Sequence, residues 1–335
     1  MHLSKAQCQQ LLPASRGDQI KSCSDVSVDF SISDNAGILI FESGNKSFIA
    51  PYVKDVNDKL LRRAESKDAV TARLLSNKMP DGLSSTIPLG AYSRERFISV
   101  DQSNESVVLD EAIIVKWQLT AQKSLSAHKE EVLKDNNFAY FPELLGNIFW
   151  GDKLIASANK FIAGTTDGWS WCVEKAKENE VSVWIENLAV LTAQMHRCLE
   201  GLIHGDFHVG QILKKSDSDQ LWVIDFEGDP LAADAQTTDV LRDVATMSAS
   251  FFHVGAVALK YGADPVKIKE WIIKAESLFT NKYFDGEAFD IAWLHSLMLD
   301  LETRELKYAD KFLPKWRYAP EFAISYMKEL GYGSN

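Results

Sequence analysis

The chain has 335 residues, enough for more than one hydrophobic core, because single cores stop growing at roughly 250 to 300 residues. Hydrophobic residues make up 46% of it and charged residues 25%, which excludes a disordered or fibrous protein. The formal net charge of −11 argues against nucleic acid or an anionic membrane as a partner, since both select clustered Lys and Arg.

The cysteines and the N-terminal residues indicate the compartment. Cys8, Cys23, Cys172 and Cys198 show no C-x-x-C spacing and no paired framework, which is typical of reduced thiols in a cytoplasmic protein. Residues 1–15 lack the apolar run of a signal peptide, and no stretch approaches the roughly 20 apolar residues of a membrane span. We therefore expect a cytoplasmic protein, and the sequence leaves its oligomeric state open.

Residues 1–90 are expected to form a separate module rich in β-strands. Turn pairs at Asp34-Asn35 and Gly44-Asn45 separate three strand-favouring stretches, at 26–34, 37–44 and 46–53. Residues 55–78 are charged and favour helix. No motif in this module indicates a chemistry.

Residues 91–160 show the order strand, turn, strand, helix, strand. At 113–118 apolar and polar side chains alternate, so Val115 and Trp117 should face a core while Lys116 points away from it. Another strand is expected at 155–161. From 161 to 335 helices dominate; apolar residues at three- and four-residue spacing mark 182–201 as a core helix. The fold class is therefore α+β.

The most informative segments are HGDFHVGQIL at 204–213 and VIDFEG at 223–228. Apolar residues precede both, so we expect strands at 201–203 and 221–224 that pair as a hairpin and bring Asp206 beside Asp225. Phosphoryl transfer needs one carboxylate to orient an acceptor hydroxyl and Mg²⁺ to neutralise phosphate charge. Because Mg²⁺ prefers a few side-chain oxygens together with phosphate and water, Asp225 and the amide of Gln211 suit the metal, and Asp206 suits the base.

Other readings of this loop stay open. A single Asp after a strand is commonly a turn or cap residue, although the ordered combination of Asp206 and Asp225 with Lys116 favours catalysis. His204 is expected to pack against the neighbouring loop and hydrogen-bond to it. His208 suits either a contact with the substrate or a brace for the loop.

HGDFHVGQ and IDFEGDP together resemble motifs of the aminoglycoside phosphotransferase and choline kinase superfamily, and within it the maltokinases and the actinobacterial glucosamine kinases. The resemblance implies a bilobal fold like that of eukaryotic protein kinases, with ATP and Mg²⁺ as cofactors. It divides the chain into an N-terminal cap (1–90), a nucleotide-binding N-lobe (91–160) and a helical catalytic C-lobe (161–335). Glu227 replaces the glycine of Asp-Phe-Gly in protein kinases and is a further metal ligand or an exposed acid.

The segment DQSNESVVLDEAIIVKWQL at 101–119 resembles the nucleotide-binding hairpin of maltokinases. Lys116 matches the phosphate-gripping lysine of the family, and Glu131, with Glu130 as the alternative, would hold it by an ion pair. The strand at 155–161 corresponds to the hinge beside adenine. Further nucleotide-binding candidates are Ser103, Asn104 and Ser106 over the phosphates, and Ser157 and Asn159 in the hinge strand.

The downstream segments bear on the acceptor. Arg242 and Asp243 open a helix and either bind sugar hydroxyls or form a buried ion pair that holds the helix to the loop. LETRELKYADKFLPKWRYAPEF at 301–322 resembles the tail of glucosamine kinases more than that of maltokinases. Its acids, Glu302 and Glu305, would supply charge-assisted hydrogen bonds to the ammonium of an amino sugar.

Two tryptophans complete the set of acceptor candidates. Trp316 or Trp169 would stack on the apolar face of a sugar, although core packing is the alternative for each. The resemblance implies phosphorylation of glucosamine to glucosamine 6-phosphate as the activity. Phosphorylation of maltose is the first alternative, and an aminoglycoside phosphotransferase or an inactive binding protein with a kinase fold is the second.

Overall fold

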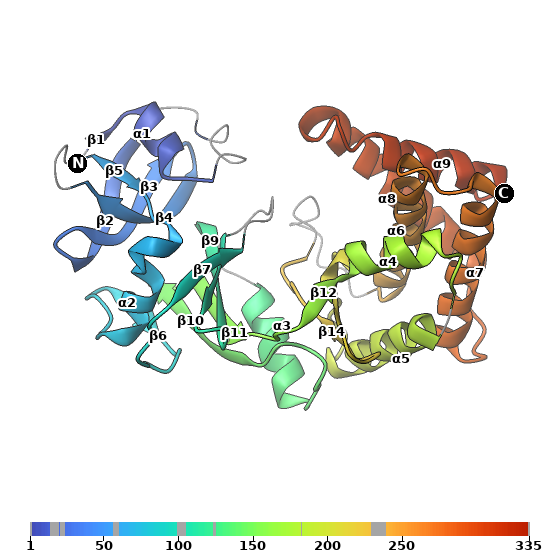
Figure 1. The fold of residues 1–335 in the computed structure, drawn as a ribbon, viewed down its shortest axis with the longest axis horizontal. Helices are drawn as coiled ribbons and strands as arrows, with labels where there is room; N and C mark the ends of the chain where they lie inside the picture. Colours follow the sequence, from blue (N-terminus) through green and yellow to red (C-terminus); the bar gives the residue numbers. More distant parts are fainter. Residues whose placement is uncertain are drawn as a thin grey trace. The chain divides into compact units, whose positions relative to one another are not determined.

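The computed structural model describes residues 2–13, 20, 24–55, 60–98, 105–122, 125–181, 183–228 and 239–333. Its contacts divide the chain into two compact units, coloured along the sequence in Figure 1. The first unit comprises Met1–Ala127 and Pro142–Ala163, and the second comprises His128–Phe141 and Gly164–Asn335. Most strands belong to the first unit and most helices to the second, so the predicted α+β class is confirmed.

Antiparallel strands build the first unit. Eleven described strands form one sheet, whose main path runs β1-β2-β3-β4-β9-β11-β10-β6, with β5, β7 and β8 pairing beside it. The elements are β1 (His2–Leu3), α1 (Lys5–Gln10), β2 (Ser24–Ser33), β3 (Ala36–Ser43), β4 (Lys46–Lys54), β5 (Leu61–Arg63), the 3₁₀ helix η2 (Ser66–Asp68), α2 (Val70–Ser76), β6 (Leu83–Ser85), β7 (Glu95–Ile98), β8 (Glu105–Leu109), β9 (Ile113–Gln122), β10 (Leu144–Trp150) and β11 (Lys153–Lys160).

The sequence pattern explains this sheet. The three strands expected near the N-terminus are β2, β3 and β4, and turns lie at both predicted pairs, 34–35 and 44–45. Strand β4 pairs with β9 through Phe48 and Thr120, so the sheet continues from residues 1–90 into the next region. Val115 and Trp117 are buried in a core that also includes Ile38 and Ile40. The functional division into cap and N-lobe stays a prediction.

Helices build most of the second unit around α6. Its elements are α3 (Leu125–Asp135, which begins in the first unit), β12 (Thr165–Asp167), α4 (Gly168–Lys177), α5 (Val183–Cys198), the 3₁₀ turn η3 (Val209–Gln211), β13 (Ile212–Lys215), β14 (Leu221–Val223), α6 (Leu241–Lys260), α7 (Pro265–Phe284), α8 (Ile291–Phe312) and α9 (Tyr318–Glu329). Helix α6 packs against α4, α7, α8 and α9, and most of its residues are buried, as is typical of a central helix.

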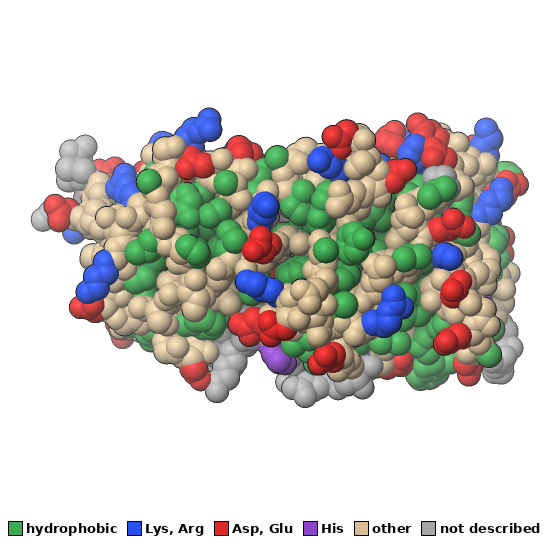
Figure 2. Space-filling view, turned by 90° about the horizontal axis from the view of Figure 1, so that it is seen from below, with side chains coloured by type: hydrophobic (Ala, Val, Ile, Leu, Met, Phe, Trp, Pro, Cys, Tyr) green, Lys and Arg blue, Asp and Glu red, His purple; other side chains and the backbone are tan. Residues whose placement is uncertain are grey.

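The outer surface is mixed in character. On the face shown in Figure 2, Lys and Arg side chains are interspersed with Asp and Glu among exposed hydrophobic groups. Such interspersed charge is ordinary for a globular protein. None of the helices in the described ranges has both the length and the apolar character needed to cross a membrane.

Candidate active site

A short hairpin positions the two motifs. The expected strand at 201–203 does not form; instead β13, which follows the first motif, pairs with β14 in the register Ile212 to Val223. The amide of Ile224 then donates to the carbonyl of Gln211 at 2.9 Å. Gln211 and Asp225 therefore leave the same end of the hairpin. Asp225 has φ +67°, a left-handed conformation that Asp adopts more readily than most residues.

His204 ties the two loops together, as expected from the sequence. Its Nε2 donates to the carbonyl of Ile224 at 3.0 Å, and its Nδ1 accepts from the amide of Asp206 at 3.3 Å. The ring is buried, and burial lowers the pKa of His204, which favours the neutral ring that these two bonds require. His204 therefore links the backbone of Asp206 to Ile224, the residue that precedes Asp225.

His208 braces the same loop. Its Nδ1 accepts from the amide of Gly210 at 3.0 Å, while its Nε2 lies 3.4 Å from the side-chain amide of Gln211 and 3.8 Å from a carboxylate oxygen of Asp206. Burial lowers the pKa of His208, against the opposing effect of Asp206. His208 therefore contacts both Asp206 and Gln211, whose predicted roles are catalysis and metal binding.

Two buried charged residues bind the backbone of the loop, one through its amides and the other through a carbonyl. The carboxylate of Asp243 accepts from the amides of His204 at 2.6 Å and Gly205 at 2.8 Å. The ammonium of Lys129 donates to the carbonyl of His204 at 2.8 Å. Burial lowers the pKa of Lys129, while Asp243, Asp206 and Asp225 act to raise it. Lys129 thus places a positive charge among the three carboxylates.

Asp243 therefore does not occupy the sugar-facing position that was one of its two expected roles. Its side chain is only 1% exposed, and both carboxylate oxygens accept hydrogen bonds from the loop backbone. The other expectation, a link between helix and loop, matches this geometry, although the partners are backbone amides and a histidine rather than Arg242. Arg242 is partly buried in the first turn of α6.

Helix α4 packs directly on the loop through two glycines. A Cβ atom at Gly168 would overlap the carbonyl oxygen of Val209, and one at Gly210 would lie 2.5 Å from the indole nitrogen of Trp169. Real Cβ atoms do not come that close to other atoms. Glycine is therefore required at position 168, where the neighbour is backbone, whereas a larger residue at 210 would have to displace the rings of Trp169 and His208. Trp169 thus lies against this loop.

Trp169, Trp316, His208 and His253 form what we call the tryptophan cluster. Trp169 and Trp316 meet edge to face with ring centroids 5.7 Å apart, and Trp169 lies 5.9 Å from His208. His253 stacks against Trp169 at 6.5 Å and 18°. Both tryptophans are only partly buried, whereas His253 is buried, so the tryptophans form the accessible part of the cluster.

Glu302 contacts this cluster through His253. It is 1% exposed and accepts from Nε2 of His253 at 2.7 Å. Burial lowers the pKa of His253, but Glu302 and Glu305 outweigh it and hold that pKa above its ordinary value. Glu302 is therefore bonded to His253, and its expected contact with an ammonium group stays a prediction. Glu305, one turn along α8, is partly exposed.

In the first unit, three predicted nucleotide-binding residues lie in one row across adjacent strands. Lys116 on β9 is directly opposite Ser106 on β8 and Ser157 on β11. Opposed residues of antiparallel strands point to the same face, and Asn159, two residues after Ser157, shares it. The amide of Asn159 also donates to the carbonyl of Pro142 at 3.1 Å. Four residues chosen from sequence thus converge on one patch of the sheet.

The remaining predicted residues have less defined surroundings. Ser103 and Asn104 lie outside the described residues. Glu131 is exposed on α3 in the second unit whereas Lys116 belongs to the first, so their ion pair stays a prediction. Glu227 is partly buried two residues after Asp225, which leaves both of its expected roles open.

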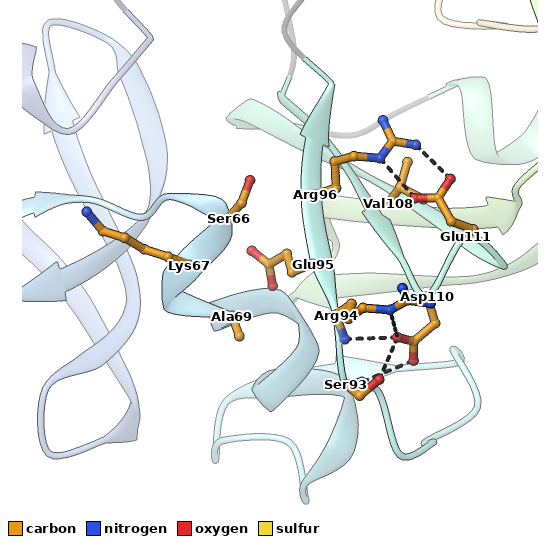
Figure 3. A pocket seen from close by; sticks show the side chains of 10 residues that line it. All are labelled: Ser66, Lys67, Ala69, Ser93, Arg94, Glu95, Arg96, Val108, Asp110 and Glu111. Carbon is orange, nitrogen blue, oxygen red and sulfur yellow. Dashed lines mark hydrogen bonds and ion pairs between the residues drawn. The ribbon is translucent and has the colours of Figure 1, made fainter.

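A separate pocket of about 450 Å³ lies within the first unit (Figure 3). It is lined by η2 on one side and by β7 and the β8–β9 turn on the other, and the carboxyl of Glu95 turns toward Ser66 of η2 in Figure 3. Among the described residues that line it, none is a predicted site residue.

The comparisons with known proteins point to one group. No protein-family model matches the sequence. A glucosamine kinase of Streptacidiphilus jiangxiensis is 28% identical, with 69% of this chain and 73% of the relative covered. A glucosamine kinase of Mycolicibacterium smegmatis is 25% identical, with 71% and 80% covered.

Solved structures give the same result at the level of the fold. A glucosamine kinase in one crystal form superposes with a TM-score of 0.76 at 22% identity, over 96% of this chain and 97% of that chain. Another, in complex with glucosamine, ADP and inorganic phosphate, gives 0.68 at 22% identity, over 91% and 94%. The chain has the glucosamine kinase fold. The predicted kinase-like fold and the resemblance to glucosamine kinases are thereby confirmed.

The sequence did not identify Lys129, His253 and His196 as part of the site. His196 is buried on α5, and its Nε2 lies 3.0 Å from the carboxylate of Asp243. Lys129 stands in the charged run AHKEEVLKD, which is typical of a solvated helix face. For His253, its place within the apolar run of α6 was the available signal, since a polar residue on a buried helix needs a partner.

Proposed function

We propose that this chain is an ATP- and Mg²⁺-dependent kinase that transfers the γ-phosphate to glucosamine, giving glucosamine 6-phosphate. The single observation that carries the proposal is the arrangement of Asp206, Gln211 and Asp225 on one loop and hairpin. The similarity to glucosamine kinases in sequence and fold supports the choice of acceptor. We keep the cytoplasm, where ATP is available, as the expected compartment.

In this proposal Asp206 accepts a hydrogen bond from the acceptor hydroxyl, orients it toward the γ-phosphate and takes its proton as the new bond forms. His204 and His208 keep that carboxylate in place through the contacts described above. Lys129 adds a fixed positive charge beside the carboxylates.

The side-chain oxygens of Gln211 and Asp225 at the end of the hairpin are suitable ligands for Mg²⁺. Among the described residues there is no cluster of three or more His, Cys, Asp and Glu side chains arranged for a metal. Mg²⁺ bound with a nucleotide does not require one, because phosphate oxygens and water complete its shell. Asp225 and Gln211 would hold it, with Glu227 as a further ligand, and it would neutralise charge on the phosphates.

The nucleotide is assigned to the row of residues on the sheet. Lys116 would bind the α- and β-phosphates, and Ser106 opposite it would cover them together with Ser103 and Asn104. Ser157 and Asn159 lie on the hinge strand beside the expected adenine. Glu131 would orient the ammonium of Lys116.

The acceptor is assigned to the tryptophan cluster. Its accessible indoles can pack on the apolar face of a pyranose, and His208 brings this surface next to Asp206. Glu305 would receive the ammonium of glucosamine, and Arg242 would bind a sugar hydroxyl. Glu302 acts through His253 rather than on the sugar itself.

The test is Mg²⁺-dependent release of ADP from ATP with glucosamine, maltose, glucose, N-acetylglucosamine or kanamycin, each against a blank without acceptor. We expect a strong preference for glucosamine, and Asp206→Asn as the matched control should release ADP about 10³-fold more slowly. Preference for maltose or kanamycin would replace glucosamine as the acceptor. No release with any acceptor, together with no stabilisation by Mg²⁺ and ATP, would indicate an inactive binding protein.

A further inference from the structure

A chain of hydrogen bonds connects three helices of the second unit to the catalytic loop. The hydroxyl of Tyr283 on α7 lies 2.8 Å from Nδ1 of His196 on α5. Nε2 of the same ring lies 3.0 Å from a carboxylate oxygen of Asp243 on α6. That oxygen also accepts from the amide of His204, and the other oxygen accepts from the amide of Gly205.

The direction of each bond follows from the donors and acceptors. Burial opposes the charge on Asp243, but hydrogen bonds from His196 and from the loop amides hold its pKa below the ordinary value, so the carboxylate only accepts. Nε2 of His196 must then be the donor. In the neutral imidazole with its proton on Nε2, Nδ1 is an acceptor. Burial, reinforced by Asp243, raises the pKa of Tyr283 to about 12, so this hydroxyl keeps its proton and donates to Nδ1 of that tautomer.

We propose that His196 and Tyr283 are positioning residues of the catalytic loop, which act through Asp243 to fix the backbone of His204 and Gly205 and hence the carboxylate of Asp206. The inference rests on the proposed function in one respect, that Asp206 carries the reaction. The placement of the loop itself stands on the hydrogen bonds alone.

The arrangement explains why two residues far from the reacting atoms matter. One oxygen of Asp243 is shared between His196 and the loop, so loss of His196 removes one of the three hydrogen bonds that fix the orientation of this carboxylate. The ring of Tyr283 meets His196 edge to face at 82°, and this fixes the imidazole in turn. Displacement of a catalytic group by about 1 Å can reduce a rate about 100-fold.

Tyr283→Phe is the first variant, because it removes only the hydroxyl and keeps the packing of the ring against Phe279 and Phe284. We expect kcat for glucosamine to fall about 3- to 10-fold, as for loss of one neutral hydrogen bond, with KM values within about twofold. Tyr326→Phe is the matched control, since its hydroxyl donates to the carbonyl of Lys269, away from the loop. It should leave kcat unchanged.

Substitutions of His196 test the chain at its centre. His196→Leu should lower kcat about 30- to 100-fold, because it removes a hydrogen bond to a charged group. His196→Gln keeps an N–H near the position of Nε2 and should recover at least about tenfold of that loss, by the same reasoning. A structural role alone predicts that Leu and Gln differ in melting temperature but not in kcat.

Hydrogen exchange of peptides that cover residues 203–208 gives a readout independent of activity. We expect the amides of His204 and Gly205 to exchange at least about threefold faster in Tyr283→Phe than in the wild type or Tyr326→Phe. Unchanged exchange and unchanged kcat in Tyr283→Phe would overturn the inference, as would equal losses in Tyr326→Phe. If the wild type phosphorylates no sugar, the proposed function fails while the exchange result still decides the positioning role.

Discussion

Glu95 lines the pocket of the first unit, and its surroundings disfavour the ionised carboxylate. It is 9% exposed, and one oxygen accepts from the amide of Ala72 at 3.0 Å, which caps the N-terminus of α2. The other oxygen is buried without a hydrogen-bond partner. Burial, with smaller contributions from Glu105 and Asp68, raises the pKa of Glu95 to about 7.

We predict that Glu95→Gln stabilises the protein at pH 8. The folded state binds a proton between pH 4.5 and about 7 that the unfolded state has released, so wild-type stability falls as pH rises through this window. The difference between 4.5 and about 7 corresponds to at most about 3 kcal/mol once Glu95 is fully ionised. Glutamine stays neutral and keeps a carbonyl oxygen for the amide of Ala72. We expect a gain of about 1–3 kcal/mol at pH 8.

The assay is urea unfolding at pH 5 and pH 8, followed through hydrogen exchange of peptides from α2 that report on the first unit. At pH 5 the variant and the wild type should differ by less than about 1 kcal/mol, because this pH lies near the lower end of the window and little of the stability has yet been lost. Glu111→Gln is the control, since Glu111 is half exposed and paired with Arg96. A variant that is less stable at pH 8, or a difference independent of pH, would refute the reasoning.

Three further predictions concern the candidate site. Asp206→Asn should lower kcat about 10³-fold with ATP affinity within about twofold, measured by turnover and calorimetry, and undiminished turnover would remove Asp206 as the base. Lys116→Ala should raise the KM for ATP at least about tenfold with little effect on the KM for glucosamine, and an unchanged ATP titration would contradict its assignment. Gly210→Ala places a methyl group 2.5 Å from the indole of Trp169. It should lower the free energy of unfolding by about 1–3 kcal/mol and should also lower kcat. A fully active and equally stable variant would show that the close contact is not required.

The sequence predicted those features whose cause is local. Alternation of Val115 and Trp117 with Lys116 located the core face of β9 and the side that carries the predicted phosphate ligand. The turn at Asp34-Asn35 was recognisable because these residues favour tight turns. Ser106, Ser157 and Asn159 were chosen from the resemblance to the family, and only the register of the three strands shows that they lie in one row with Lys116.

The expected strand at 201–203 failed because a short apolar run does not distinguish a strand from a packed connection. Ile203 is buried, as the pattern predicted, but Gly201 adopts φ +90° after α5 and the backbone does not join the sheet. The partner position beside β14 is occupied by β13, which ends in two lysines. Competition between two segments for one edge is not visible in either segment alone.

Buried charges were the other features beyond the reach of the sequence. Lys129 lies in a charged run, yet it is buried because its partner is the carbonyl of His204, 75 residues away along the chain. His196 and Asp243 likewise contact each other although they are 47 residues apart along the chain. Their roles depend on which elements the fold brings together, whereas helix periodicity reports only which face is apolar.

The most direct test of the central claim is identification of the product. Purified protein is incubated with ATP, Mg²⁺ and glucosamine, and the product is analysed by phosphorus and carbon NMR, with Asp206→Asn treated identically. The account predicts one phosphomonoester on the 6-hydroxyl of glucosamine in the wild-type reaction and, over the same time, about 10³-fold less of it in the variant. An unphosphorylated sugar in the wild-type reaction, or equal product from both proteins, would contradict it.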